Sequence, residues 1–215
     1  MRFAKQKQLV LVWDLPVRVF HWLLVVSFAG AWLTSESEAQ QMLHYAFGYS
    51  ACALVVFRIF WGLAGTRYAR FTQFVKGPKA TLEHTKSLLT SKDNAGLGHN
   101  PAGAIAMILL MLLILLIGIT GYLSIKEFLG DLMSEAHELI SNFTIGVIAI
   151  HVMAAIFMSL IQKENLIRSM VSGKKRGTSE QAIRYPMYLI GIILGLGWIC
   201  FFSLVVNGDI AFLIR

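Results

Sequence analysis

Four histidines lie within long apolar stretches of this 215-residue chain, namely His21, His44, His137 and His151. An ionisable residue inside a membrane segment is costly, and it is a candidate for function by default. The two remaining histidines, His84 and His99, fall in a polar segment and need no such explanation. The four apolar-segment histidines are therefore the first candidates for chemistry.

Two of these histidines share one predicted helix. His137 and His151 are 14 residues apart. At 100° per residue they are offset by about 40°, so they share a face, and they lie about 21 Å apart along the helix axis. One therefore lies near each end of a membrane-spanning helix.

The elements that must position these histidines are five predicted membrane spans. The chain is 56% hydrophobic and 14% charged, whereas a soluble domain has about 25% charged residues. A spanning helix needs about 20 mostly apolar residues, and five segments qualify: 17–33, 43–63, 103–123, 136–161 and 186–206. Pro186 is expected at the first position of the last helix. The predicted fold class is an all-α integral membrane protein, a four-helix transmembrane bundle plus a fifth transmembrane helix.

The positions of the basic residues predict how the chain crosses the membrane. Of 19 Lys and Arg residues, 15 precede the first span or lie in the 64–102 and 162–185 loops, whereas only Lys126 and Arg215 fall on the other side. Basic residues concentrate in cytoplasmic loops, so we expect a cytoplasmic N-terminus and a periplasmic C-terminus. The net charge of +7 is then a topology signal, and nucleic acid is not expected as a partner. A short amphipathic surface helix is predicted at 78–89, within the first loop.

This topology pairs the four histidines by depth. His21 and His151 lie at the cytoplasmic level, and His44 and His137 at the outer level. Two imidazoles at one level, on different helices, can supply both axial bonds to one haem iron. The pattern predicts an inner and an outer haem b. With both axial positions filled, electron transfer is favoured over oxygen chemistry.

Other interpretations of the histidines stay open at this point. A single histidine in a span is often a hydrogen-bonded packing residue. A copper site is a weaker option, because two imidazoles per level would need further ligands. The two cysteines, Cys52 and Cys200, form no CxxC or CxxCH motif, so neither an iron–sulfur cluster nor a covalently attached haem is expected.

Three further residues are candidates for the haem sites. Arg58 follows His44 by 14 residues on the same helix face, so it either pairs with a propionate of the inner haem or extends to the cytoplasmic surface. Arg18 is a second propionate candidate, or else a plain topology determinant. Gly48, one turn after His44, would leave room for the edge of the macrocycle.

Several motifs resemble a known family. They are the segments Val12–Trp22 (VWDLPVRVFHW), His44–Tyr49 (HYAFGY) and Arg58–Gly62 (RIFWG), together with the histidine pair in the fourth span. In combination they resemble the bacterial cytochrome b561 family, which includes the cytochrome b subunits of nickel–iron hydrogenases. The histidine pair is also similar to that of the cytochrome subunit of formate dehydrogenase. The resemblance covers residues 11–161.

The resemblance implies the same histidine pairing, and it implies a quinone pocket near the cytoplasmic haem. The run Gly98-His99-Asn100-Pro101 resembles the segment that contributes to that pocket, so His99 and Asn100 are candidate quinone-site residues. Alternatively, Asn100 caps the third span, with Pro101 as its first helical residue. Both roles are compatible.

The fifth span departs from the four-span members of the family, which leaves the partner open. Its Gly191 and Gly195 form a GxxxG motif that packs against the bundle or against another protein. We divide the chain into a di-haem bundle, 1–161, and a basic loop with the fifth helix, 162–215.

The function expected from these observations is transfer of electrons across the bacterial inner membrane, between a periplasmic redox partner and membrane quinone. The partner would be a c-type cytochrome or a hydrogenase or dehydrogenase subunit. A stand-alone superoxide:quinone oxidoreductase is the alternative, although the outer loops lack the cationic funnel that would attract superoxide. A transporter or scaffold without haem is a third possibility.

Overall fold

The computed structural model describes residues 8–73, 97–98 and 101–210 of the chain. Its elements in chain order are β1 (Gln8–Leu11), α1 (Leu15–Leu33), η1 (Glu38–Gln40), α2 (Gln41–Ala64), η2 (Phe71–Gln73), α4 (Pro101–Ile125), α5 (Asp131–Gln162), α6 (Leu166–Ser172), β2 (Lys174–Gly177), η3 (Ser179–Gln181) and α7 (Tyr188–Val206). The predicted surface helix at 78–89 lies outside the described residues.

Five of these helices are long and apolar enough to cross a membrane. They coincide with the five predicted spans, and the chain is a multi-pass membrane protein. α5 has 32 residues, so at 1.5 Å per residue it is about 48 Å long and exceeds the hydrocarbon core of about 30 Å. It begins at Asp131, five residues before the predicted start of the fourth span. α4 begins at Pro101, as predicted for a first helical residue.

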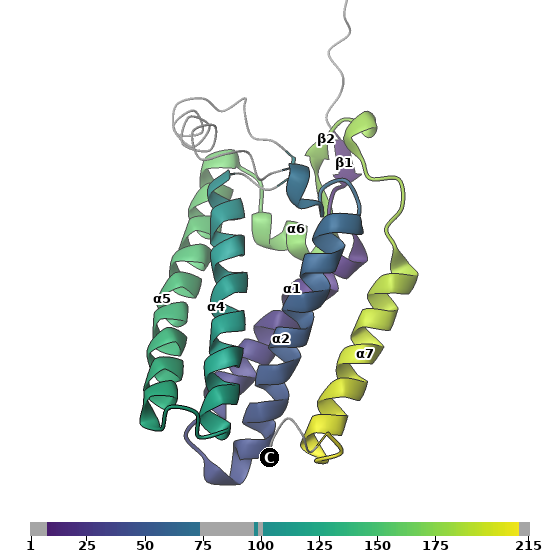
Figure 1. Ribbon diagram of the computed structural model, residues 1–215. Coiled ribbons are helices and arrows are strands. Elements are labelled where there is room, and N and C mark those ends of the chain that lie inside the picture. Colours follow the sequence, from purple (N-terminus) through teal and green to yellow (C-terminus); the bar gives the residue numbers. More distant parts are fainter. Residues whose placement is uncertain (1–7, 74–96, 99–100, 211–215) are drawn as a thin grey trace, which may run out of the picture.

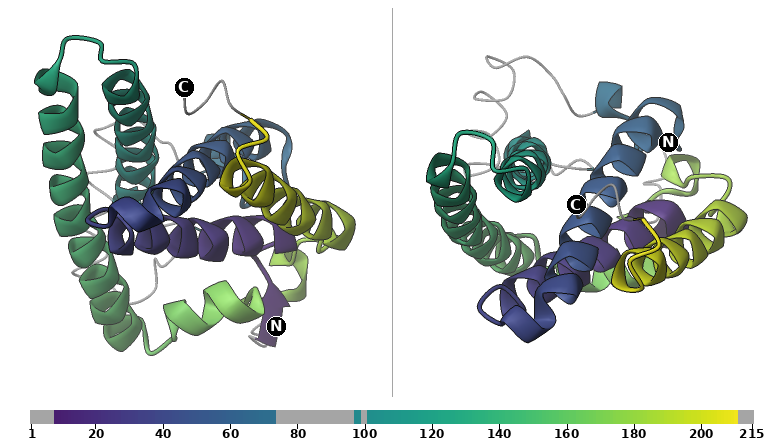
Figure 2. Two further views of the ribbon diagram at one scale, coloured as in Figure 1. Left: turned by 90° about the horizontal axis from the view of Figure 1, so that it is seen from below. Right: turned by 60° about the horizontal axis from the view of Figure 1, so that its bottom comes forward.

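The spanning helices pack in pairs (Figure 1). α1 packs against α2, α4 packs against α5, and α2 also contacts α4. α7 packs against α1 and α2, on the side away from α4 and α5, as both views of Figure 2 show. Of the α5 side chains that the structure describes, only that of Thr144 is fully buried. Most of α5 therefore faces lipid or the space beside its paired helices.

The fifth helix is an integral part of the fold. The missing side chain of Gly191 lets α7 approach α1, because a Cβ there would lie 2.6 Å from Leu15 Cγ. The indole of Trp198 donates to Ser27 Oγ at 3.0 Å. Gly195, by contrast, has open space around it. Gly191 of the GxxxG motif thus makes a close contact with α1, whereas Gly195 does not pack against the described part of this chain.

The predicted start of the fifth helix was wrong. α7 begins at Tyr188, and Pro186 lies before it. Met187 adopts a left-handed conformation with φ of 56°, which a continuous right-handed helix cannot contain. The Pro186 carbonyl instead accepts the backbone N–H of Leu15 at 2.9 Å, so the proline joins α7 to the start of α1.

A small folded cap, not predicted from the sequence, covers one end of the helices. It consists of β1, α6, β2 and η3. β1 and β2 form an antiparallel two-stranded sheet, with Leu9 opposite Arg176. Gly173 ends α6 with φ of 77°, and its carbonyl accepts the N–H groups of Val12 and Trp13 at 2.8 and 3.0 Å. The N-terminal segment is therefore held against the loop between α5 and α7, across the predicted division at residue 161.

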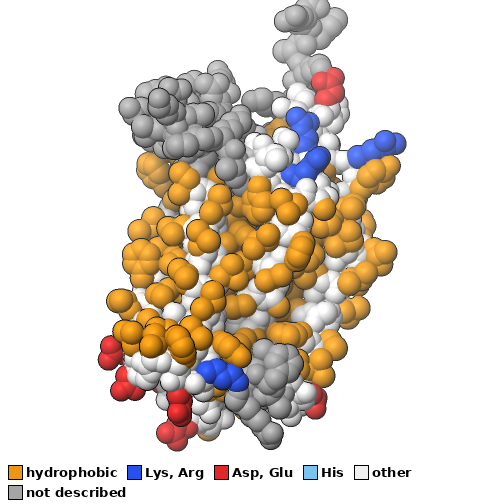
Figure 3. Space-filling view, in the orientation of Figure 1, with side chains coloured by type: hydrophobic (Ala, Val, Ile, Leu, Met, Phe, Trp, Pro, Cys, Tyr) orange, Lys and Arg blue, Asp and Glu red, His pale blue; other side chains and the backbone are white. Residues whose placement is uncertain are grey.

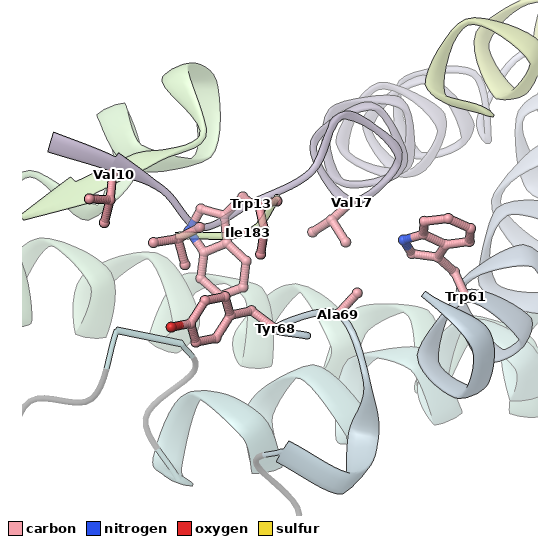
Figure 4. Packing of buried hydrophobic residues seen from close by; sticks show 8 residues of the cluster. Val10, Trp13, Val17, Trp61, Tyr68, Ala69 and Ile183 are labelled. Carbon is pink, nitrogen blue, oxygen red and sulfur yellow. The ribbon is translucent and has the colours of Figure 1, made fainter. Parts of the chain in front are cut away.

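The larger cluster of buried hydrophobic residues joins the cap to the adjoining ends of α1 and α2 (Figure 4). Its members are Val10, Val12, Trp13, Val17, Trp61, Tyr68, Ala69 and Ile183. Lys175 is 5% exposed in the same region. Burial lowers the pKa of its ammonium group, and the nearby Glu164 carboxylate opposes that shift.

Asp14 connects the cap to the helices. Its carboxylate is fully buried, and Oδ1 caps α1 by accepting the N–H of Val17 at 2.8 Å. Oδ2 accepts the indole N–H of Trp61 at 3.0 Å and the hydroxyl of Thr66 at 2.6 Å. One side chain thus fixes the start of α1 against the end of α2.

We predict that Asp14→Ala destabilises the protein by about 3 kcal/mol, because it removes a helix cap and leaves buried donors of Trp61 and Thr66 without an acceptor. Thermal unfolding in detergent should show a melting temperature several degrees lower. Asp209→Ala changes an exposed carboxylate and is the matched control. Equal melting temperatures for the two variants would contradict this role of Asp14.

Candidate haem site

His44 and His137 lie together at the end of the helices opposite the cap. His44 is in the first turn of α2, His137 is in the second turn of α5, and their ring centres are 6.1 Å apart. An imidazole nitrogen lies about 2 Å from a metal that it binds, so two imidazoles on opposite sides of one iron have ring centres about 6 Å apart. The pair therefore has the spacing of two axial ligands.

Hydrogen bonds to backbone carbonyls fix both rings. His44 Nδ1 lies 2.8 Å from the carbonyl oxygen of Ala31 on α1, and His137 Nδ1 lies 2.9 Å from that of Ile117 on α4. A carbonyl oxygen only accepts, so in both rings Nδ1 carries the proton and Nε2 keeps its lone pair. Histidines that bind metals have this arrangement, in which the second ring nitrogen donates to a fixed acceptor.

Gly48, one turn after His44, has open space beside it. A Cβ added there would meet no atom within 4 Å, which is compatible with the edge of a macrocycle at this position. A pocket at the surface is lined by His44, Tyr45, Glu36 and Glu38 together with neighbouring polar residues. The histidine pair is therefore close to the acidic end of the molecule.

The second histidine pair lies nearer the cap. His21 is in the second turn of α1, and His151 is in the second half of α5. The two imidazoles are close enough to interact electrostatically. Nδ1 of His21 is buried and has no hydrogen-bond partner. A buried polar atom without a partner is rare, and here it belongs to a residue predicted to bind haem.

Arg58 lies between this level and the cap, and it does not reach the surface. Its side chain is 1% exposed. Nη2 donates to the Ala69 carbonyl at 2.9 Å, and the guanidinium lies over the ring of Phe71. Nη1, however, is buried without a partner. The surface position considered for Arg58 is excluded, and a free donor remains for an anionic group.

Arg18 contacts the cap. Its Nη1 donates to the carbonyl of Val171 in the last turn of α6 at 2.7 Å, where a cation is favourable. Its Nε is buried and has no hydrogen-bond partner. The two quinone-site candidates, His99 and Asn100, lie outside the described residues.

Sequence reasoning missed the groups that orient the ligands. The Asp14 cap could have been found, because Asp followed two residues later by Pro is typical of a helix start. The carbonyls of Ala31 and Ile117 carry no sequence signal, since every residue has one. Their role follows only from how α1 packs on α2 and α4 on α5.

Five apolar spanning helices and a pair of imidazoles at axial-ligand spacing define the class: an integral-membrane haem protein. The sequence profile of the prokaryotic cytochrome b561 family matches residues 12–173, and the chain belongs to that family. It is a membrane b-type cytochrome that carries haem b and acts in electron transfer.

Curated relatives agree with this assignment. A probable Ni/Fe-hydrogenase B-type cytochrome subunit of Rhizobium leguminosarum bv. viciae is 23% identical, with 80% of this chain and 91% of the relative covered. The protein of the same description from Azotobacter vinelandii is 24% identical, covering 79% and 90%. A probable Ni/Fe-hydrogenase 1 B-type cytochrome subunit of Escherichia coli (strain K12) is 23% identical, covering 75% and 88%. No solved structure gave a significant match.

Proposed function

We propose that this cytochrome binds two haems b and passes electrons between a periplasmic redox partner and membrane quinone. His44 and His137 hold the outer haem, and His21 and His151 hold the inner one. The observation that carries the proposal is the 6.1 Å separation of the His44 and His137 ring centres, with both Nδ1 atoms on carbonyls and both Nε2 atoms available.

Haem iron with both axial positions filled supplies one-electron transfer without a site for oxygen. At the outer level, the Ala31 and Ile117 carbonyls restrain the two rings. Rings that cannot turn require little reorganisation when the charge on the site changes.

Arg58 pairs with a propionate of the inner haem through its free Nη1. The guanidinium is buried, and a buried cation without a full set of acceptors is costly, so a carboxylate there would offset the cost. The unpartnered Nε of Arg18 offers a second donor near the cap. We assign Arg58 as the main propionate partner because its side chain is the more deeply buried.

The charges support an orientation with the cap in the cytoplasm. In Figure 3, Lys and Arg side chains appear at the cap end, whereas Asp and Glu side chains predominate at the opposite end. By the positive-inside rule, the N-terminus is cytoplasmic, the C-terminus is periplasmic, and the membrane is the bacterial inner membrane. His44 and its acidic pocket then face the periplasm.

The partner on the periplasmic side is a nickel–iron hydrogenase. This proposal rests on the relatives named as hydrogenase cytochrome subunits, whose lengths the chain matches almost fully. The pocket beside His44 gives such a partner a short approach to the outer haem. Quinone is the acceptor at the cytoplasmic level, with His99 and Asn100 as proposed contacts.

We predict two haems b per chain in the purified protein by pyridine haemochrome assay. His44→Ala and His137→Ala should each remove the outer haem, and His21→Ala and His151→Ala the inner one, because one axial bond alone holds haem weakly. His84→Ala, which changes a histidine outside the spans, should keep both. Two haems in every variant would refute the ligand assignment.

Replacing the buried Arg58 should change the midpoint potential of the inner haem and leave that of the outer haem unchanged. Arg58→Met removes a cation that stabilises the reduced, less positive state, so the midpoint potential of the inner haem should fall. Arg58→Lys should retain part of the effect, and Arg67→Met, at an exposed arginine, should have none. Redox titration of the purified protein measures these potentials. An unchanged potential in Arg58→Met would exclude the propionate role.

Native membranes exposed to hydrogen gas test the partner. We expect hydrogen to reduce the haem b of this protein. In a chain with His137→Ala, which should lack the outer haem, hydrogen should no longer reduce the inner haem, because electrons enter at the outer site. Dithionite, which reduces haem directly, checks that the remaining haem is still redox-active. Reduction by dithionite but never by hydrogen, in the unchanged chain, would reject a hydrogenase partner.

A further inference from the structure

The hydrogen bond between His137 and α4 is unusual because its acceptor lies inside a helix. The Ile117 carbonyl belongs to the α4 segment Pro101–Ile125, where each carbonyl already accepts the N–H of the residue four positions later. For Ile117 that residue is Gly121. His137 Nδ1 reaches the same oxygen at 2.9 Å, in addition to the Thr120 hydroxyl, which donates to it at 3.1 Å.

Gly121 leaves the space in which the His137 ring lies. A Cβ at position 121 would be 3.0 Å from both Cε1 and Nδ1 of His137. Contacts this short are tighter than ordinary packing, so the ring would have to move away by a few tenths of an ångström. The hydrogen bond to Ile117 would then lengthen, and its geometry would worsen.

The His44 imidazole also donates to a backbone carbonyl, but this hydrogen bond does not depend on a glycine. Ala31 is in the last turn of α1, which ends at Leu33, and carbonyls in a last turn lack their usual helical partner. The N–H of Ser35, four residues on, donates to Trp32 instead. The Ala31 carbonyl therefore lacks a helical N–H donor because the helix ends there, and it accepts from His44 at 2.8 Å and from the Thr34 hydroxyl at 3.3 Å.

The inner histidine His21 differs from the two outer histidines in the hydrogen-bond partner of Nδ1. Nδ1 of His21 is buried with no acceptor, whereas both outer imidazoles donate to carbonyls. Donation from Nδ1 makes an imidazole a stronger electron donor to the metal that it binds. It thereby stabilises the oxidised iron and lowers the reduction potential.

We infer that Gly121 is a positioning residue of the outer haem site: it gives the His137 imidazole access to the Ile117 carbonyl, and that hydrogen bond holds the reduction potential of the outer haem down. The inference rests on the proposed ligation of the outer haem by His44 and His137. It adds a residue that touches neither iron nor partner and acts through the ring of His137.

The test is a graded pair of substitutions in the full-length protein, Gly121→Ala and Gly121→Val. Gly146→Ala and Gly146→Val are the matched controls, because Gly146 lies on the face of α5 opposite His137 and a Cβ there would meet nothing within 4 Å. Haem content is measured by pyridine haemochrome, and the two midpoint potentials by spectroelectrochemical titration. Adding His151→Ala to each chain leaves the outer haem alone and assigns its potential.

We expect Gly121→Ala to keep two haems, with the outer midpoint potential shifted upward and the inner one unchanged. Gly121→Val should lose the outer haem and keep the inner one. Both Gly146 variants should match the unchanged protein. An outer potential and haem content unaffected by either Gly121 substitution, or a shift confined to the inner haem, would overturn the inference.

If neither Gly121 variant accumulates in membranes, the unchanged oxidised protein decides the question. Electron–nuclear double resonance detects the Nδ1 protons of the axial imidazoles, and we expect those of the outer haem to resist exchange in D2O. Rapid exchange would overturn the inference. These outcomes differ from failure of the ligand assignment, in which His137→Ala would still contain two haems.

Discussion

An imidazole in the apolar interior of a membrane protein needs a partner for each of its two ring nitrogens. Lipid offers none, and an unmet polar group there is costly. The outer histidines solve half of this problem with backbone carbonyls, Ala31 for His44 and Ile117 for His137. The other nitrogen of each ring is left for a metal. Under the proposed ligation, haem would meet the coordination needs of side chains that are otherwise expensive to place.

Two buried hydrophobic clusters hold this arrangement together. One lies between α2 and α4 and consists of Ala51, Val55, Met111 and Ile114. The other joins the cap to the adjoining ends of α1 and α2, where Asp14 ties the start of α1 to the end of α2. The first turn of α1 is fixed in this way, and the position of His21 follows from it along one rigid helix. α7 fastens the other side of the same two helices through Gly191 and Trp198.

The sequence predicted the parts of the fold that depend on composition and helical period. Five spans, the positions of four histidines and their pairing by depth all follow from 1.5 Å and 100° per residue. The cap could not be predicted in this way, because β1 and β2 are four residues each and lie more than 160 residues apart. The start of α7 was misjudged because a proline suits the first turn of a helix, and only the left-handed Met187 shows that this proline lies outside it. The role of Gly121 was not predicted, because it depends on the packing of α5 against α4, which brings the His137 ring to this position.

The central claim is that each of two haems lies between a histidine of α5 and a histidine of α1 or α2. Anomalous diffraction at the iron absorption edge tests it most directly, because it locates iron without reference to the protein. We predict two iron peaks per chain about 20 Å apart, the rise of the 14 residues between His137 and His151. One peak must lie between His44 and His137, and the other between His21 and His151. A single peak, or iron away from these four rings, would contradict the account.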